Sequence, residues 1–181
     1  GPLAEARFHE PEGLCVEGDR LYVADTENHA VRRVDLRRKV VETLAGTGRI
    51  GAAARRGPGR ETPLSSPWDV ALDGDVLYIA MAGRHQVWTL DLGGGTVGPF
   101  AGSGAEDIVD GELDDAAFAQ PSGLALAGGK LYVADSEVSG VRVIDLEKGL
   151  VGTLVGEGLF EFGDVDGEGK GARMQHVLGV A

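Results

Sequence analysis

Short apolar runs bounded by polar turns recur in the same order along the whole chain. The run Leu-Tyr-Val-Ala-Asp at 21–25 returns as Leu-Tyr-Ile-Ala-Met at 77–81 and as Leu-Tyr-Val-Ala-Asp at 131–135. Runs of this length that are rich in Val, Leu, Ile and Tyr favour β-strands. Short polar turns that contain glycine follow the first run of each copy, as tight hairpins require.

The spacing of this repeat is nearly constant, because Pro11, Pro67 and Pro121 begin corresponding runs at intervals of 56 and 54 residues. Each copy contains four β-prone runs, and four antiparallel strands in a repeat are typical of a propeller blade. The sequence therefore predicts an all-β fold, a β-propeller of about three four-stranded blades plus the first strand of a fourth. In the first copy we place the strands at 12–17, 20–25, 30–36 and 40–45.

The whole chain, residues 1–181, is expected to form a single partial propeller. We expect blades at about 8–48, 64–104 and 118–158, and the first strand of a fourth blade at 172–181.

The first run of each copy is rich in small residues, as strands that crowd round a central axis need. Cys15 stands where the other copies have Ala71 and Ala125. We therefore interpret Cys15 as a small buried residue and not as a nucleophile. Since it is the one cysteine of the chain, no internal disulfide can form.

Glycine is unusually frequent, with 30 of 181 residues, or more than twice the usual share of about 7%. Glycine is costly inside helices and useful in tight turns. The composition therefore argues against a helical bundle and favours many short strands joined by many turns.

The net charge of −12 is unevenly distributed. Residues 1–60 carry 11 basic and 9 acidic side chains, whereas residues 61–181 carry 6 and 20. An acidic surface repels phosphate groups, so we expect no nucleic-acid binding. We interpret the basic cluster at 32–39 as a solvated turn. The sequence contains neither a run of 18 apolar residues nor a signal-peptide pattern, so we expect no membrane association, and a cytoplasmic location is compatible.

These repeats resemble the NHL-repeat family of β-propellers. The family pattern contains a Pro-x-Gly-Leu strand, a Leu-Tyr-Val-Ala-Asp strand, an Asn-His turn and a Val-Arg-x-Val-Asp strand. The first copy matches it nearly throughout, with Asn28 and His29 at the turn. The second copy keeps His85 but has Met81 in place of the Asp, and the third has Ser139 in place of the His.

Segments at 62–69, 101–111 and 159–164 further resemble a subgroup of this family in which a thioredoxin-like domain precedes a six-bladed propeller. That domain is absent from this sequence, so we carry over no redox activity.

Three blades and one strand cannot close a ring, since propellers close with roughly four to eight blades. Exposed blade faces at both ends would be apolar patches that favour pairing. Two interpretations stay open: a fragment whose remaining blades belong to a longer chain, which we favour, and a homodimer that completes a six-bladed ring.

Polar residues from corresponding loops are expected to converge on one rim around the mouth of the axis. If this chain binds a protein or a small ligand, we expect the site on that rim. Its candidate residues are Asp25, Asn28, His29, Arg84, His85 and Asp135. The competing interpretation is that the aspartates cap their turns and that the histidines bond to neighbouring backbone.

Catalytic chemistry has little support in the residue pattern. No Ser-His-Asp order, Gly-x-Ser-x-Gly turn or phosphate-binding glycine loop is present. The acidic turn that begins at Asp164 lacks the EF-hand glutamate, because Gln175 stands at its twelfth place. We interpret this turn and the similar one at 107–111 as solvated loops, and expect no catalytic residue, metal or cofactor.

The sequence therefore favours a non-catalytic scaffold that binds a protein or a small ligand. One alternative is a metal-assisted lyase or hydrolase with its site at the channel mouth. That function would need inward His or carboxylate groups from several copies, whereas the aligned positions supply only His29, His85 and Ser139. The other alternative is nucleic-acid binding, against which the charge of residues 61–181 argues.

Overall fold

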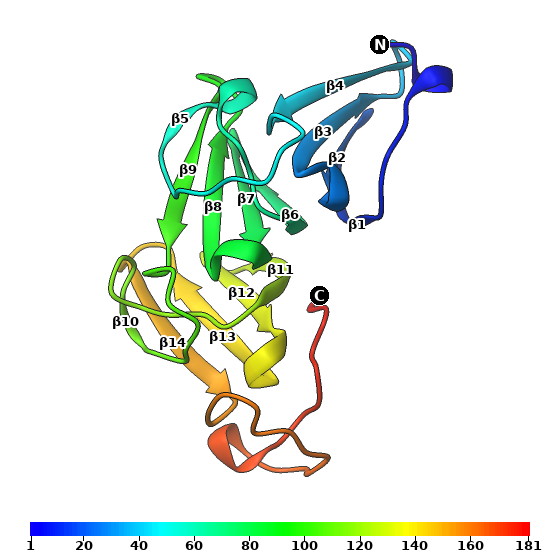
Figure 1. The fold of residues 1–181 in the computed structure, drawn as a ribbon. Helices are drawn as coiled ribbons and strands as arrows, with labels where there is room; N and C mark the ends of the chain where they lie inside the picture. Colours follow the sequence, from blue (N-terminus) through cyan, green and yellow to red (C-terminus); the bar gives the residue numbers. More distant parts are fainter.

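The computed structural model describes residues 1–181, except the side chain of Lys170, and consists of three antiparallel sheets arranged along an arc (Figure 1). The first sheet contains β1 (Pro11–Glu17), β2 (Arg20–Asp25), β3 (Ala30–Asp35) and β4 (Val40–Ala45). The second contains β5 (Gly57–Pro58), β6 (Pro67–Asp73), β7 (Val76–Met81), β8 (Gln86–Asp91) and β9 (Thr96–Ala101). The third contains β10 (Gly111–Glu112), β11 (Pro121–Ala127), β12 (Lys130–Asp135), β13 (Gly140–Asp145) and β14 (Leu150–Val155).

The prediction of an all-β fold built from short hairpins is confirmed. The four strands predicted for the first copy begin and end within one residue of β1 to β4. The helices are single 3-10 turns, and none in the described part of the chain is long and apolar enough to cross a membrane.

Two very short strands, β5 and β10, are absent from the sequence prediction. Each lies in the long loop ahead of a sheet and pairs with the last strand of that sheet, β5 with β9 and β10 with β14. The loops therefore run along the outer edge of the following sheet. Two-residue strands carry too little hydrophobic pattern to be found without this pairing.

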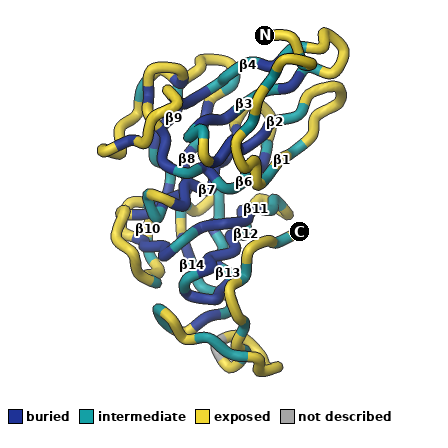
Figure 2. Tube along the Cα trace, turned by 45° about the vertical axis from the view of Figure 1, so that its right-hand side comes forward, coloured by how far each residue is buried: buried dark blue, intermediate teal, exposed yellow. Residues whose placement is uncertain are grey.

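The sheets pack face to face, and the buried residues lie mainly at their two interfaces (Figure 2). At the first interface Tyr22 and Val31 pack against Leu77 and Ile79 of the second sheet. At the second, the corresponding Tyr78 and Val87 of the second sheet pack against the third sheet. Full burial of one such aliphatic side chain contributes about 1.5–3 kcal/mol, so this repeated packing is the main stabilisation of the fold.

Glycine permits the close approach of neighbouring first strands. A Cβ on Gly13 would lie 2.6 Å from Cα of Asp69, and one on Gly123 would lie 2.8 Å from Cα of Gly179. Both distances are too short for any other residue. β1, β6, β11 and the C-terminal segment around Gly179 therefore lie side by side.

The C-terminal segment differs from the prediction of a strand at 172–181. It forms no strand, and the Ser122 hydroxyl donates to the Val177 carbonyl (3.1 Å) where the segment passes β11. In each sheet the first strand pairs with the strand that follows it in the chain. Within residues 1–181 no strand follows this segment, so it takes the place of a first strand without pairing as one.

Candidate functional site

The turns between the second and third strands of each sheet carry most of the rim residues expected from the sequence. These turns are η2 (Thr26–Asn28), η4 (Ala82–Arg84) and η5 (Ser136–Val138). Each ends on a residue in the left-handed region, His29 (φ 47°), His85 (φ 54°) or Ser139 (φ 47°). This conformation is unfavourable for residues other than glycine, so surrounding contacts must hold it.

The side chains at these three positions bond to the segment that leads into the next sheet. Ser66 N donates to His29 Nδ1 (3.1 Å), His85 Nδ1 donates to the Ala119 carbonyl, and His176 N donates to Ser139 Oγ (3.0 Å). Histidine and serine therefore have the same role at this repeat position: each side chain bonds the turn of one sheet to the segment that leads into the next sheet. This geometry agrees with the interpretation that the two histidines are backbone-bonding turn residues.

Asp25 and Asp135 are fully buried and do not face an open rim. Asp25 accepts hydrogen bonds from His9 N (2.8 Å) and Asn28 Nδ2 (3.0 Å), and it pairs with Arg32 (3.3 Å). Asn28 belongs to the turn, but His9 N and Arg32 lie outside it, and neither Asp25 nor Asp135 caps the backbone of its turn. The interpretation of these aspartates as turn caps is therefore wrong, because their bonds run to the segment ahead of the sheet and to its third strand.

Asp135 has an equivalent but more enclosed environment. It accepts from Ala119 N (3.1 Å) and Gln120 N (2.6 Å), and Arg142 lies 3.6 Å away. Burial raises the pKa of Asp135, while the two backbone donors and the Arg142 guanidinium favour its ionised form. The guanidinium also lies 5.1 Å from the centre of the Phe118 ring.

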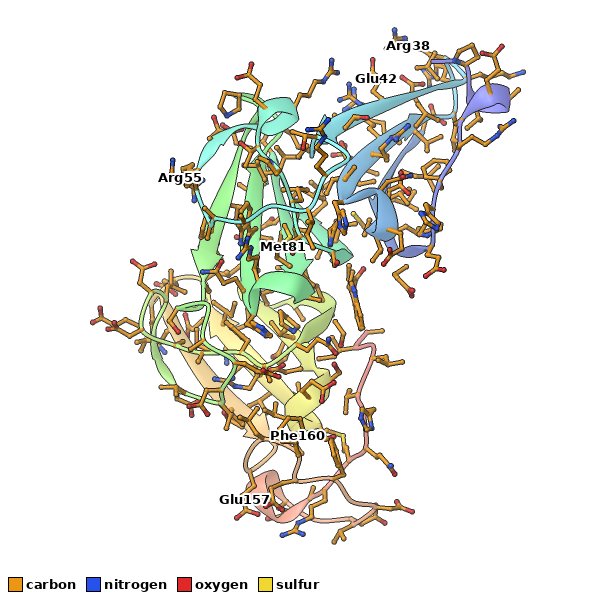
Figure 3. All side chains as sticks on the ribbon, viewed as in Figure 1. Arg38, Glu42, Arg55, Met81, Glu157 and Phe160 are labelled. Atoms are coloured by element: carbon orange, nitrogen blue, oxygen red, sulfur yellow. The ribbon has the colours of Figure 1, made fainter. Side chains whose placement is uncertain are left out.

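In the middle sheet, apolar residues stand at the positions of this aspartate and arginine. Met81 stands at the place of the aspartate and Trp88 at the place of the arginine, and both are fully buried. Leu64 takes the place of the phenylalanine and packs in the same cluster. Figure 3 shows Met81 within the side-chain packing of this sheet. The three residues change together because a charge in this position is stable only with its partner.

The rim residues therefore do not converge on one cavity. Arg84 donates to the Gly51 carbonyl, and Asn28 lines an open pocket beside Arg32 on the first sheet. The remaining four fasten turns and sheets, as described above.

A different group of residues forms a hollow at the axis, on the same face as these turns. The first strands of the sheets begin there, and the hollow has a volume of about 340 Å³. Glu12, Trp68, Ser122 and Leu178 stand at one repeat position, and Gly13, Asp69 and Gly179 at the next; together they line the hollow.

Asp69 is the unusual residue of this axial hollow, because the other copies have glycine at its position. Leu124 N donates to Asp69 Oδ2 (2.7 Å), and Val70 N donates to Oδ1 (2.8 Å). Burial raises the pKa of Asp69, although both backbone donors favour the ionised form. A partly desolvated carboxylate beside the Trp68 ring and the exposed Glu12 would interact favourably with a cationic group.

Sequence reasoning missed this hollow, although the aligned repeats contain a signal for it. The flanking positions are nearly constant, whereas the lining position changes from Glu12 to Trp68, Ser122 and Leu178. Such variation at one position between constant neighbours indicates side chains that do not pack between sheets. The replacement of glycine by Asp69 is a second signal.

The remaining candidates have structural roles. Cys15 is half-buried and not fully buried as expected, and it packs against the cluster at the first interface. This partial burial, Asp69 and Glu17 raise the pKa of its thiol to about 11, which opposes a nucleophilic role. The basic cluster is paired with acids, for example Arg33 with Glu42 at 2.5 Å. Among the residues whose side chains are described, no three His, Cys, Asp or Glu groups lie together in a way that could hold a metal ion.

The acidic turn at 107–111 was expected to be a solvated loop, and Asp110 is indeed exposed, but its carboxylate also bonds to the third sheet. Arg142 donates to Asp110 Oδ1 (3.0 Å), and the Thr153 hydroxyl donates to the same oxygen (2.7 Å). Partial burial opposes ionisation, but these two partners prevail and lower the pKa of Asp110.

Comparison with known proteins identifies the repeat. The family model described as "NHL repeat" matches residues 8–34 and 118–144. These are the copies with the Asp–Arg pair, and the middle copy, with Met81 and Trp88, lies outside the matched residues.

The chain is also similar to longer proteins. It is 45% identical to NHL repeat-containing protein 2 of Gallus gallus and 44% identical to that of Homo sapiens, each match covering 99% of this chain and 29% of the relative. It is 42% identical to the Arabidopsis thaliana protein SUPPRESSOR OF QUENCHING 1, chloroplastic, over 99% of this chain and 18% of that protein. The chain thus spans less than a third of the length of these relatives.

Solved structures show the same fold at low identity. A structural genomics protein of unknown function from Bacteroides thetaiotaomicron superposes with a TM-score of 0.74 at 19% identity, over 93% of this chain and 41% of that one. An auxiliary nutrient binding protein from Bacteroides ovatus superposes with a TM-score of 0.74 at 18% identity, over 97% and 44%. Both have propeller-type folds, which confirms the predicted fold class.

Proposed function

This chain belongs to the NHL-repeat proteins and has their propeller-type fold, and from that premise we propose that it is a non-catalytic binding module whose ligand enters the axial hollow. The observation that carries the proposal is the hollow itself, with Trp68 and Asp69 at positions where neighbouring copies have smaller residues. Its volume of about 340 Å³ falls at the small end of ligand pockets.

The chemistry of the lining favours a ligand with a positive charge on a short apolar stem. The Trp68 ring offers a flat surface for the stem and a favourable face for a cation. Glu12 and Asp69 supply two carboxylates, and no basic side chain lines the hollow among the residues that the structure describes. A lysine or arginine side chain of a protein partner, or a small alkylammonium compound, fits this description.

Binding of a cation would also relieve the burial cost of the Asp69 carboxylate. Because burial raises the pKa of Asp69, a bound positive charge would lower it again and release a proton where the group was protonated. The proposed affinity is therefore greater at neutral pH than at pH 4.

The test uses the two indole N–H signals in a proton–nitrogen NMR spectrum of the labelled protein. Trp68 lines the hollow, whereas Trp88 is buried and donates to Gln86 Oε1 (3.0 Å), so its signal is an internal control. Titration with N-acetyl-lysine methylamide should shift the Trp68 signal and leave that of Trp88 unchanged.

The neutral analogue N-acetyl-norleucine methylamide is the matched ligand control, since it keeps the stem and lacks the charge. Asp69→Asn is the matched variant, because Asn can still accept from Leu124 N. Both changes should weaken the shift of the Trp68 signal. An unmoved Trp68 signal, or an equal response to the neutral analogue, would exclude a cation-binding hollow.

A further inference from the structure

A row of aromatic and apolar side chains runs from the loop after β14 to the axial hollow. The rings of Phe160 and Phe162 meet edge to face with their centres 6.2 Å apart, and the Phe162 ring stacks on that of His176 at 4.5 Å. Two residues beyond His176, Leu178 lines the hollow. We call Phe160, Phe162, His176 and Leu178 the apolar strip.

The apolar strip is open to solvent. Phe160 is 59% exposed, His176 and Leu178 are exposed as well, and Phe162 is half-buried between its neighbours. Single exposed apolar side chains are common on proteins, whereas adjoining ones usually mark a site of interaction. The strip is therefore a candidate extension of the axial hollow.

The turn η5 of the third sheet holds this strip at two points. Phe160 N donates to the Glu137 carbonyl (3.1 Å), close to η5 (Figure 3), and His176 N donates to Ser139 Oγ (3.0 Å). The backbone of Phe160 lies in the left-handed region (φ 60°), which is unfavourable for a large side chain. Residues held in this way are concentrated at binding sites. The bonds to η5 also preorganise the strip, so a ligand has little loop ordering to pay for.

The exposure of Phe160 belongs to its position in the repeat. A shift of 110 residues places Phe160 on Ile50. Ile50 is 65% exposed, although the second sheet follows it and packs on the first. The same shift places His176 on Ser66, which is half-buried. A following sheet therefore leaves this side of the loop uncovered.

The charge around the apolar strip is acidic. Residues 157–181 carry five acidic and two basic side chains, and one of the basic ones, Arg173, pairs with Glu157 (3.4 Å). Glu161 and Asp164, on either side of Phe162 in the chain, are exposed. At the other end of the strip the hollow contributes its own carboxylates. Charge complementarity therefore favours a partner that is basic as well as apolar.

The length of the strip suits a short peptide. Two ring contacts and two residues of chain separate Phe160 from Leu178, a path that about four to six residues of an extended peptide would span. A free alkylammonium compound would reach only the hollow. A segment of protein chain would also cover the exposed phenylalanine.

We infer that the ligand is a peptide segment of a partner protein, with a lysine or arginine side chain in the axial hollow and an aromatic side chain against Phe160. An aromatic ring would continue the edge-to-face and stacked contacts of the strip. This inference rests on the cation-binding hollow proposed above and adds the class of partner and its second contact. Because one peptide makes both contacts, its affinity exceeds that of either group alone.

Synthetic peptides test the inference, with the indole signal of Trp68 as the reporter of binding. Two peptides contain one lysine and one phenylalanine separated by Gly-Ser-Gly-Ser, in the two chain directions, and N-acetyl-lysine methylamide measures the hollow alone. We expect one of the peptides to bind about tenfold more tightly than N-acetyl-lysine methylamide. The same peptide with alanine in place of phenylalanine should lose this gain.

Phe160→Ala and Val165→Ala form a matched pair of variants, since Val165 is an exposed apolar residue of the same loop that lies outside the strip. Phe160→Ala should abolish the tenfold gain and leave the affinity for N-acetyl-lysine methylamide unchanged. Val165→Ala should change neither. An unchanged Trp88 signal verifies that each variant is folded.

The outcomes separate this inference from the proposed function. If N-acetyl-lysine methylamide shifts the Trp68 signal but phenylalanine adds no affinity in either direction, the hollow binds a free cation and the peptide contact does not exist. Equal effects of the two variants would also overturn the inference. If neither the peptides nor N-acetyl-lysine methylamide shifts the Trp68 signal, the hollow and the inference are both wrong.

Discussion

Replacing Arg142 by methionine should remove the largest single polar stabilisation of the third sheet. The guanidinium donates to Ala117, Val109 and Asp110 and pairs with Asp135. The variant leaves the Asp135 carboxylate buried without its cation and removes the side-chain donor to the Ala117 and Val109 carbonyls, which keep only their backbone bonds to each other. Breaking a buried pair in this way costs about 3–5 kcal/mol, or more than about a hundredfold in the folding equilibrium.

The apolar group of the middle sheet indicates which substitutions would compensate for the loss of Arg142. Asp135→Met with Arg142→Trp and Phe118→Leu reproduces the Met81, Trp88 and Leu64 group. Replacement of a buried ion pair by apolar residues of similar volume is often nearly neutral. The triple variant should therefore be within about 2 kcal/mol of the native chain and more stable than Arg142→Met.

Equilibrium unfolding in urea, followed by far-ultraviolet circular dichroism, measures both effects. Arg38→Met is the control, since Arg38 lies at the outer edge of the first sheet and its nearest carboxylates are 4.0 Å away (Figure 3). That variant should differ from the native chain by less than about 0.5 kcal/mol. A cost below about 1 kcal/mol for Arg142→Met, or a triple variant no more stable than the single one, would refute the reasoning.

Three further predictions follow from single positions. Because the Cys15 thiol has a pKa of about 11 instead of 9.0, its alkylation at pH 8 should be about a hundredfold slower in the folded than in the urea-unfolded chain; equal rates would contradict the raised pKa. Gly13→Ala should unfold or detach the first sheet, because its Cβ would lie 2.6 Å from Cα of Asp69, whereas Gly179→Ala has open space and should change the urea midpoint little; similar midpoints would show that β1 and β6 can separate freely. Burial raises the pKa of Asp69, so the stability contributed by its protonated form is present below the unfolded pKa and is lost as pH rises through the folded pKa. Asp69→Asn should remove this component from urea unfolding curves measured between pH 3 and pH 8, and an unchanged pH dependence would contradict the shift.

The candidate site was only partly accessible to sequence reasoning. The rim residues were found because they occupy repeated turns, but their bonds to the next sheet involve residues 34 to 37 positions away. Whether His29 and His85 face a ligand or bond to neighbouring backbone can therefore be decided only from the packed sheets. The axial hollow was missed because its lining comes from three sheets and the C-terminal segment.

The sequence by itself determined the strands, the hairpins and the register of the repeat, because these depend on local alternation and on glycine at tight turns. It also contained the paired changes of Asp25 and Arg32 to Met81 and Trp88, which are visible once the copies are aligned. Only the tertiary structure decided which side chains are buried partners and which remain open. Burial of a charge depends on what the neighbouring sheet and loop bring to it, so Arg142 is enclosed while its repeat equivalent Arg32 lines a pocket.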